Sequence, residues 1–421
     1  MVDWVIDAAA AAGATDIKAI VSSHHAEVAA HLDSYTPGVS RAKGAGDDRS
    51  TQRMHVEVLF QREPHGTADA VKQVPAEALA AGDVLVINGD SPLLTAETIR
   101  RLVEEHRRSG AEATLATVED PRRDDGRVIR TPDGAFEKIV ERKEASDEER
   151  KATEFNVGLY CFQGNALVKA LAKITNDNQS GEFYLPDVLA HMQPVAIVRI
   201  EDADEAAGIN DRVTLAAVTS ALRQRILTRH MLAGVTVTDP ASTFIDAEVQ
   251  IGQDTVVEPF SIIKGVTHIG SGCRIGPHVH IEDARIGDRS DCGPFVKIRP
   301  GTEVAEDVHI GSFAELVRTK IGRGSKVPHL SYLGDTTIGE DANVGAGTIT
   351  ANFNGEVKNR TQIGDGAFVG VDTMLVAPVK LGKGSRTGAG SVVTKDVPDG
   401  ATAVGVPARV IRRKSVSSDG K

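Results

Sequence analysis

Two short stretches of this chain place chemically capable side chains in settings that resemble loops. One is Pro328 to Asp335 (PHLSYLGD), in which His329 follows a proline and precedes a tyrosine and a Gly-Asp pair. The unperturbed pKa of histidine lies nearest to working pH, so His329 could serve as a general base. A lone histidine is more often a structural residue than a catalyst, but these neighbours indicate a loop rather than a coil position.

The other stretch is Asn88-Gly89-Asp90, which directly follows the apolar run 83–87 (DVLVI). Such a run is typical of a strand that is buried on both faces of a parallel sheet. Ligands of α/β sheets bind at the carboxyl ends of the strands, so Asp90 is placed for chemistry. A turn carboxylate with no further task is the plainer interpretation of its local sequence.

The element that would position His329 is a repeat of six residues between Phe244 and Pro398. An aliphatic residue followed by glycine returns at multiples of six, give or take one, as in Ile251-Gly252, Ile269-Gly270 and Ile310-Gly311. In a solenoid of short strands the aliphatic residue points into a narrow core, and glycine suits a crowded corner. Three hexads make one coil. An antiparallel sandwich would instead need longer, strictly alternating strands.

The residues before this repeat predict a different kind of domain. Helical and strand periodicities alternate there, with helices over 2–12, 25–32 and 96–108 and strands over 17–21, 56–60, 83–87 and 113–118. This alternation predicts an α/β domain. We expect this domain over 1–210, a linker helix over 211–233, a β-helix over 244–408 and a loose tail over 409–421.

Composition narrows the class of protein. The chain has 421 residues, of which 41% are hydrophobic, 25% charged and only 4% aromatic, and its formal net charge is −11. An acidic chain of this kind argues against nucleic acid as a general partner. Its three cysteines form no CxxC pair, and neither a membrane span nor a signal peptide is present, so we expect a cytoplasmic protein without membrane partners.

The motifs of the first part occur in a specific order, and the order is more informative than any single motif. They are Phe60 to Ala70 (FQREPHGTADA), Asn88 to Leu93 (NGDSPL), Gly126-Arg127, Ile139 to Lys143 (IVERK), Asn156 to Gly158 (NVG), Gly181 to Tyr184 (GEFY) and Gly208 to Arg212 (GINDR). In this order they resemble the Rossmann-like nucleotidyltransferase half of the bacterial bifunctional UDP-N-acetylglucosamine pyrophosphorylase/glucosamine-1-phosphate N-acetyltransferase. With the repeat that follows, the resemblance covers nearly the whole chain.

The resemblance implies roles for this half in uridylyl transfer from UTP to N-acetylglucosamine-1-phosphate. Asp90 and Asn210 would hold Mg²⁺, a hard cation that takes few protein oxygens together with phosphates and water. The other residues implied to bind the nucleotide or the sugar are Gln61, Gly66 and Thr67 at the uracil end, Asn88 and Gly89 beside Asp90, and Gly126, Glu141 and Asn156 at the sugar.

The hexapeptide part is similar to the acetyltransferase half of the same family, which implies a left-handed parallel β-helix and a homotrimer. There His329 would be the general base that takes a proton from the amine of glucosamine-1-phosphate, with Glu315 orienting it. Arg299 would clamp the sugar phosphate. The remaining implied contacts are Tyr332, Asn343 and Lys358 for the sugar phosphate, and Ala346, Asn352, Phe353 and Ala389 for acetyl-CoA.

Several positions depart from the family pattern. Val317 stands where the family has a lysine, with Arg318 beside it as a substitute cation. Phe353 replaces a tyrosine, Val371 a serine near the coenzyme, and Val406 an arginine to which Arg409 is close. These departures bear on substrate and coenzyme binding rather than on the identity of the base.

The start of the chain is a further departure. The family opens with a strand and a Gly-rich loop that wraps the triphosphate, whereas this sequence begins within a predicted helix that has no N-cap. We therefore expect an incomplete first domain with weak uridylyl transfer.

The leading function is bifunctional synthesis of UDP-N-acetylglucosamine. One alternative is a zinc enzyme of the γ-carbonic anhydrase type, with His278, His280 and His309 as candidate ligands. The other is a non-catalytic sensor of sugar nucleotides, which turnover with acetyl-CoA would exclude.

Overall fold

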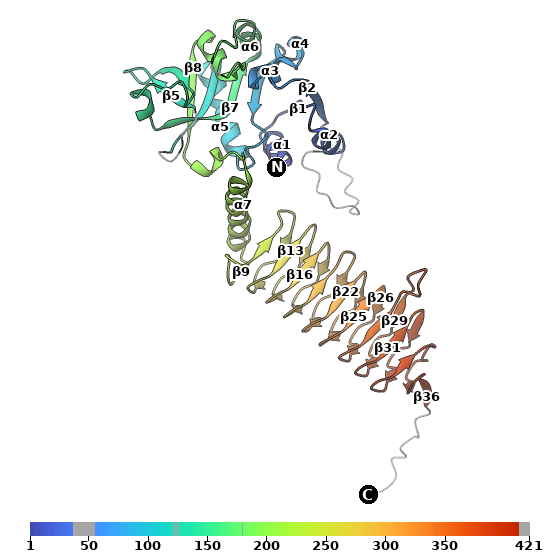
Figure 1. Cartoon of the computed structure of the whole chain (residues 1–421). Coiled ribbons are helices and arrows are strands. Elements are labelled where there is room, and N and C mark those ends of the chain that lie inside the picture. The colour runs from blue at the N-terminus through green and yellow to red at the C-terminus, as the bar shows by residue number, and fades with distance from the viewer. Residues whose placement is uncertain (37–54, 121–122, 124–125, 179, 412–421) are drawn as a thin grey trace, which may run out of the picture. The chain divides into compact units, whose positions relative to one another are not determined.

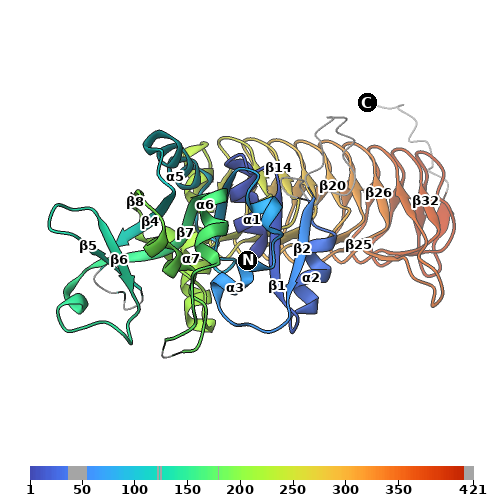
Figure 2. The same ribbon diagram turned by 90° about the horizontal axis from the view of Figure 1, so that it is seen from above.

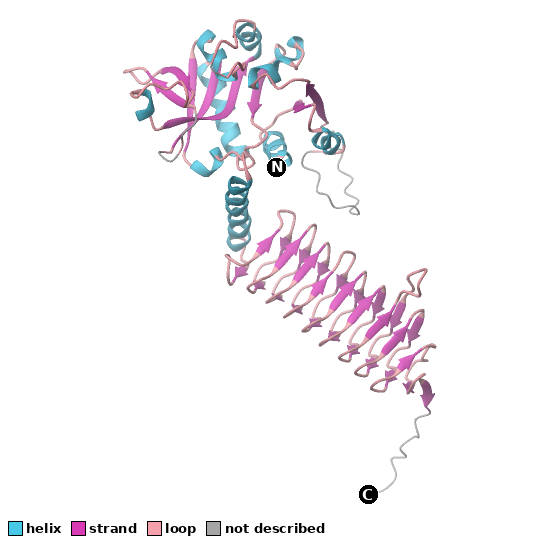
Figure 3. Ribbon diagram, viewed as in Figure 1, coloured by secondary structure: helices cyan, strands magenta, loops and turns pink. Residues whose placement is uncertain are grey.

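A computed structural model describes residues 1–36, 55–120, 123, 126–178 and 180–411 of the chain (Figure 1). The described residues divide into two compact units, the first ending at Ala221 and the second beginning at Leu222. The first unit is α/β and the second is a stack of short strands, as Figure 3 shows by colour. Both predicted fold classes are confirmed.

The first unit is built on a mixed sheet. Its strands follow the order β6-β5-β7-β4-β8, and β3 also pairs with β7. β4 and β8 are parallel, whereas β7 runs antiparallel to β3, β4 and β5. The strands are β3 (Asp83–Ile87), β4 (Ala113–Glu119), β5 (Arg127–Arg130), β6 (Phe136–Val140), β7 (Glu154–Gln163) and β8 (Val195–Ile200).

Helical segments cover both faces of this sheet. Successive residues of a strand point to opposite faces, so neighbouring residues of β7 pack with different helices. Tyr160 and Phe162 of β7 pack with α3, α6 and η2, whereas Leu159 and Cys161 pack with α5. Thr95 caps α5 and Gly110 ends it in the left-handed conformation. The segments are α3 (Thr67–Lys72), α4 (Ala76–Leu79), α5 (Ala96–Ser109), α6 (Gly164–Leu171), η1 (Glu149–Lys151), η2 (Leu185–His191) and η3 (Ala203–Ala206).

A second, smaller sheet precedes the large one in the chain. It consists of β1 (Ile17–Ser22) and β2 (Val56–Gln61), which are parallel. In the chain, α1 (Val2–Ala11) precedes β1, and α2 (Ala26–Asp33) lies between the two strands. Among the described strands β3 pairs with β7 alone, and its residues 84–87 are only partly buried. The prediction that 83–87 is a parallel strand buried on both faces is therefore wrong.

The helix α7 (Arg212–Leu232) carries the chain from the first unit into the second. Asp211 begins it, because its carboxylate accepts the backbone N–H of Thr214 at 2.7 Å. Near its end Leu227 is fully buried in the core of the second unit, and the Arg223 guanidinium lies over the ring of Phe244.

The second unit is a solenoid of three parallel sheets, which we number in the order the chain visits them; Figure 2 shows its coils following one another. Sheet I contains β9 (Thr236–Val237), β12 (Val256–Val257), β15 (Arg274–Ile275), β18 (Asp291–Cys292), β21 (His309–Ile310), β24 (Lys326–Val327), β27 (Asn343–Val344), β30 (Phe368–Val369), β33 (Arg386–Thr387), β35 (Thr402–Val404) and the antiparallel β36 (Arg409–Ile411). The chain is thus still regular at 409–411, where the loose tail is predicted, and 412–421 lie outside the described residues.

Sheets II and III complete each coil. Sheet II contains β10 (Phe244–Ile245), β13 (Ile262–Lys264), β16 (His280–Glu282), β19 (Lys297–Ile298), β22 (Glu315–Val317), β25 (Tyr332–Gly334), β28 (Ile349–Ala351), β31 (Met374–Val376) and β34 (Val392–Val393). Sheet III contains β11 (Gln250–Ile251), β14 (His268–Ile269), β17 (Arg285–Ile286), β20 (Glu303–Val304), β23 (Lys320–Ile321), β26 (Thr336–Ile338), β29 (Thr361–Ile363) and β32 (Val379–Leu381).

The repeat explains this architecture. Ile251 pairs with Ile269 in the next coil, so eighteen residues make one turn there. The aliphatic residues are buried in one continuous core. The positions that follow them have no room for a side chain, because a Cβ on Gly252 would lie 2.7 Å from the Gly270 carbonyl carbon of the next coil. Stacking of adjacent coils thus fixes glycine at these corners, while the handedness of the coil stays a prediction.

Candidate active sites

Three of the residues predicted for acetyl transfer lie together on sheet II. Glu315 and Tyr332 are register partners in β22 and β25, so their side chains emerge side by side from the sheet. Arg299 follows β19 and donates from Nη1 to Oε1 of Glu315 at 3.2 Å. Both side chains of this pair remain about two-fifths exposed, at 45% and 36%. The result is an accessible cation and a phenol on one face.

His329 lies at the corner between β24 of sheet I and β25 of sheet II, and its side chain is exposed. The Ser331 hydroxyl donates to the His329 carbonyl oxygen at 3.0 Å and ties the turn together. Among the described residues no side chain hydrogen-bonds the imidazole. The hydrogen bond that Glu315 accepts comes from Arg299, so the predicted contact between Glu315 and His329 is not formed here.

The residues predicted for acetyl-CoA continue along that corner. Ala346, Val371 and Ala389 occupy it in the three coils that follow His329. Each of these residues is small or aliphatic and has a glycine neighbour. Backbone hydrogen bonds join these coils: Asp372 N–H donates to the Ala346 carbonyl at 2.7 Å, and Gly390 N–H donates to the Val371 carbonyl at 2.8 Å. Val371, where the family pattern has serine, is 48% exposed.

The other predicted acetyl-site residues are spread over the neighbouring surfaces. Asn343 belongs to β27 of sheet I, a different face from that of Tyr332. Phe353 and Lys358 are exposed in the loop between β28 and β29, where they form an isolated bridge. Arg318, the expected substitute cation, donates two hydrogen bonds to Asp335, whose carboxylate also accepts from Asn352.

In the first unit, Gln61 is held at the end of β2. Its Nε2 donates to the Gly66 carbonyl at 3.1 Å and to Asp69 Oδ2 at 2.7 Å. Gly66 has φ +112°, and a Cβ there would lie 2.5 Å from the Phe183 carbonyl oxygen. The Thr67 hydroxyl accepts from Leu185 N–H at 2.9 Å. The predicted uracil-end residues therefore form one packed loop that is clamped by the segment after Gly181.

Asp90 and the segment that leads into Asn210 come from distant parts of the chain and meet at the end of β3. The Asp90 carbonyl accepts from Ile209 N–H at 3.0 Å, and a Cβ on Gly208 would lie 3.6 Å from Asp90 Oδ2. Asp90 is partly exposed and Asn210 exposed. A carboxylate and an amide that are open to solvent are the oxygen donors that suit Mg²⁺ when phosphates and water supply the rest.

Gly126, Glu141 and Asn156 also converge. Asn156 N–H donates to the Gly126 carbonyl at 2.9 Å, and a Cβ on Gly126 would lie 3.1 Å from Glu141 Oε1. Asn156 Nδ2 donates to the Tyr160 hydroxyl at 2.6 Å. Burial raises the pKa of Tyr160, so this hydroxyl stays neutral.

The residues after β3 join this group to Asp90. A Cβ on Gly158, which has φ +79°, would lie 2.3 Å from Asn88 Nδ2, so the amide of Asn88 rests against β7 next to the Gly126 cluster. Gly89 is exposed between Asn88 and Asp90. Residues predicted for the sugar and for the metal thus share one end of the large sheet.

Comparisons with known proteins agree with this organisation. A family profile described as Nucleotidyl transferase matches residues 1–203, and one described as Bacterial transferase hexapeptide (six repeats) matches residues 248–283. The Bifunctional protein GlmU of Geobacillus thermodenitrificans (strain NG80-2) is 44% identical over 83% of this chain and 81% of its own length. That of Fervidobacterium nodosum (strain ATCC 35602 / DSM 5306 / Rt17-B1) is 42% identical over 98% of this chain and 90% of its own. The chain belongs to the GlmU family.

Membership makes the chain a bifunctional transferase with a nucleotidyl transferase domain and a hexapeptide domain. The Nucleotidyl transferase profile matches from residue 1, so the expectation of an incomplete first domain gains no support from it.

The zinc alternative fails on geometry. His278 lies at a corner between the rings of Phe260 and Phe295, His280 lies on sheet II, and His309 lies on sheet I, where its Nδ1 bonds to Asp291 Oδ2 at 2.6 Å. Nowhere in the described chain do three His, Cys, Asp or Glu side chains gather as metal ligands. Within one chain the three histidines therefore do not form the predicted zinc site.

Sequence reasoning missed several residues that shape these GlmU-type sites. Asp69, Tyr160 and Asp335 each fix a predicted ligand-binding amide. Asp69 and Asp335 lie inside motifs quoted for other residues, so their motif membership was an available signal. Tyr160 lies in an apolar strand and resembles an ordinary core residue.

In the part of the chain described here, no helix is long and apolar enough to cross a bilayer.

Proposed function

We propose that this GlmU-family chain makes UDP-N-acetylglucosamine in two steps: acetyl transfer from acetyl-CoA to glucosamine-1-phosphate at the solenoid, then uridylyl transfer from UTP at the first unit, in the cytoplasm. The observation that carries the proposal is the exposed His329 at the corner next to Arg299, Glu315 and Tyr332 on sheet II. Residues 244–408 would carry the first step and residues 1–210 the second.

In the first step the sugar amine attacks the thioester carbonyl carbon, and a nitrogen of the His329 imidazole takes the amine proton. The carbon–sulfur bond breaks, and the sulfur takes the proton from the imidazolium, so coenzyme A leaves as the thiol and the base is restored. Arg299 supports the sugar phosphate with the part of its guanidinium that Glu315 does not engage. Asn343, Tyr332 and Lys358 complete the sugar-phosphate contacts. Ala346, Asn352, Phe353 and Ala389 receive the coenzyme.

In the second step a phosphate oxygen of N-acetylglucosamine-1-phosphate attacks the α-phosphorus of UTP, and pyrophosphate leaves. Asp90 and Asn210 would hold Mg²⁺, which neutralises phosphate charge when bound. Gln61, Gly66 and Thr67 bind uracil, and they belong to the loop that packs against Phe183. Asn88, Gly89, Gly126, Glu141 and Asn156 receive the sugar and the neighbouring phosphates.

The solenoid offers a surface for a homotrimer. Phe260, His278, Phe295 and Phe313 stack along the same corner that carries His329, with ring centroids 4.7, 4.9 and 5.1 Å apart. Leu330 continues this aromatic ridge, and the three phenylalanines and Leu330 are about half exposed, from 47% to 60%. An exposed apolar ridge of this kind supports contact with a second copy. Asn343, on another face, would then serve a neighbour's site.

The proposal is tested by two separate assays on the purified chain. Coenzyme A release should require glucosamine-1-phosphate and acetyl-CoA together, and pyrophosphate release should require UTP and N-acetylglucosamine-1-phosphate together. Tight binding of UDP-N-acetylglucosamine with turnover in neither assay would favour the sensor instead.

A further inference from the structure

Asp335 stands at the centre of a hydrogen-bond network beside the acetyl-transfer candidates. It follows β25 at the corner between sheets II and III, and its side chain is only 14% exposed. Oδ1 accepts from Arg318 Nε at 2.6 Å, and Oδ2 accepts from Arg318 Nη2 at 2.8 Å and from Asn352 Nδ2 at 2.6 Å. A two-pronged guanidinium contact leaves the carboxylate little freedom to rotate.

This network fixes the direction of the Asn352 amide. Asn352 is 6% exposed, its N–H donates to the Thr350 carbonyl at 2.9 Å, and its carbonyl accepts from Asn359 N–H at 2.6 Å. The backbone is therefore held on both sides. Turning the side-chain amide over would place Oδ1 against the Asp335 carboxylate, and two acceptors repel each other. In the described chain no donor reaches Oδ1, which is left as an oriented acceptor.

Tyr332 and Gly334 show how tightly the amide is packed. A Cβ on Gly334 would lie 2.6 Å from Asn352 Nδ2 and 2.8 Å from the Tyr332 hydroxyl oxygen, so both side chains close over this glycine. The Gly-Asp pair therefore does two tasks: glycine makes room for the amide and aspartate orients it. The Arg318 guanidinium holds the pKa of Asp335 below its usual range, with help from Asn352 and Lys358, so the orienting charge persists at neutral pH.

We infer that Asp335 is a positioning residue for acetyl transfer, which turns the Asn352 amide so that Oδ1 accepts a hydrogen bond from an amide N–H of acetyl-CoA. The inference rests on the proposed function of the solenoid. It also assigns Arg318 to the support of Asp335, which removes it as a replacement for the lysine missing at Val317.

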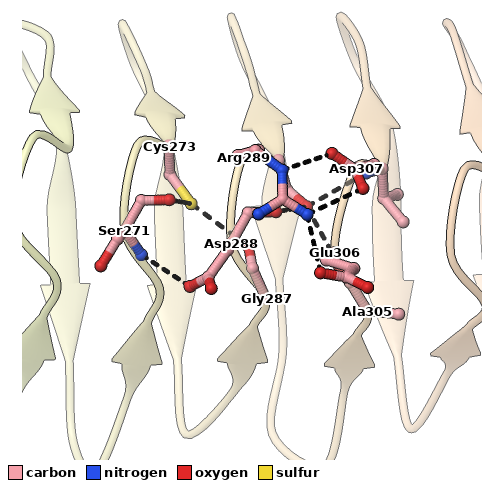
Figure 4. Close-up of polar contacts among 10 residues, drawn as sticks. Ser271, Cys273, Gly287, Asp288, Arg289, Ala305, Glu306 and Asp307 are labelled. Atoms are coloured by element: carbon pink, nitrogen blue, oxygen red, sulfur yellow. Dashed lines mark hydrogen bonds and ion pairs between the residues drawn. The ribbon is translucent and has the colours of Figure 1, made fainter.

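The chain contains a matched control pair two coils away. Arg289 donates from Nε to Asp307 Oδ1 at 2.8 Å and from Nη2 to Asp307 Oδ2 at 3.0 Å, with Glu306 as an additional acceptor (Figure 4). Arg289 and Asp307 have φ values of +53° and +59°, close to the +49° and +51° of Arg318 and Asp335. This pair lies at the corner between sheets III and I, and among the described residues no side-chain amide joins it. It therefore reproduces the two-pronged contact between arginine and aspartate of neighbouring coils without the proposed task.

The experiment compares Asp335→Asn with Asp307→Asn in the full chain. Asp335→Asn should raise the KM for acetyl-CoA about tenfold while the KM for glucosamine-1-phosphate changes less than twofold, and Asp307→Asn should change neither. Asn352→Ala should raise the KM for acetyl-CoA similarly, and Asp335→Asn should add nothing further in the Asn352→Ala background, because both changes remove one contact. A merely structural aspartate would instead give additive losses.

The outcomes separate this inference from the proposed function. If the wild-type chain turns over and Asp335→Asn behaves like Asp307→Asn, the positioning role is wrong and the acetyltransferase proposal stands. If the wild-type chain does not turn over, calorimetric titration with acetyl-CoA decides the positioning role by the same comparison of variants. A wild-type chain that binds no acetyl-CoA would overturn both.

Discussion

At the scale of single residues, the chain divides its chemistry between groups that are left accessible and groups that are held. His329 is exposed, whereas Asn352, Gln61 and Asn156 are each fixed by a neighbouring side chain. A base must reach a proton on a substrate that comes and goes, while an amide gains selectivity when its donor and acceptor sides are fixed in advance. The three amides are thus oriented in advance, whereas the base is left accessible.

His329→Ala should lower the turnover number for acetyl transfer by about a hundredfold or more, as loss of a general base does. Folding should be intact, because the side chain is exposed and no described side chain bonds to it. Steady-state rates of coenzyme A release measure the effect, and circular dichroism measures folding. His268→Ala, on sheet III, serves as the control. Wild-type rates in His329→Ala would remove His329 as the base.

At the scale of elements, more of the fold of the solenoid than of the α/β unit could be predicted from the sequence. Its six-residue period is local and repeats, so each coil predicts the next, and Ile251 and Ile269 do pair. The α/β unit depends on pairings between distant strands, which no local pattern encodes. The run 83–87 has the composition of a central strand, yet it pairs with β7 in antiparallel fashion and is half buried.

In the candidate sites, too, local signals could be predicted and contacts between distant residues could not. Motif order predicts Asp90, Asn210 and His329 as site residues, because they lie in motifs with distinctive neighbours. The contact of Glu315 with Arg299 could not be predicted from spacing. It depends on how the side chains of neighbouring strands in sheet II are oriented. The isolated pattern Asn156-x-x-x-Tyr160 gave no sign that the two side chains bond.

The loop between β2 and α3 gives a prediction at this scale. Gly66→Ala should destabilise the first unit by about 2 kcal/mol or more, because alanine is strained at φ +112° and its Cβ would press on the Phe183 backbone. Pyrophosphate release should fall sharply while coenzyme A release stays at the wild-type level. Thermal denaturation of Gly66→Ala beside Gly82→Ala, where a Cβ would meet nothing within 4 Å, measures the effect. Equal melting curves would contradict this account of the loop.

At the scale of the whole molecule, the aromatic ridge Phe260–His278–Phe295–Phe313 predicts assembly. Replacing Phe295 and Phe313 together by serine should convert a trimer into smaller species in sedimentation and should lower acetyl transfer, because two contacting rings are lost from the exposed corner. Phe244→Ser, which alters an exposed phenylalanine outside the ridge, should leave the trimer intact. A monomeric wild-type chain with full acetyl-transfer activity would contradict the trimer.

Removal of divalent metal should separate the two activities of the chain. The only oxygen pair proposed for Mg²⁺ is Asp90 with Asn210 in the first unit, whereas the acetyl-transfer residues rely on an imidazole, a guanidinium and amides. Chelation with excess EDTA should therefore abolish pyrophosphate release and leave coenzyme A release within twofold of the untreated rate. Added Mg²⁺ should restore the first activity in the wild-type chain but not in Asp90→Ala, since the lost carboxylate cannot be replaced by water alone at the same site. Pyrophosphate release that survives chelation would show that the metal pair is assigned wrongly.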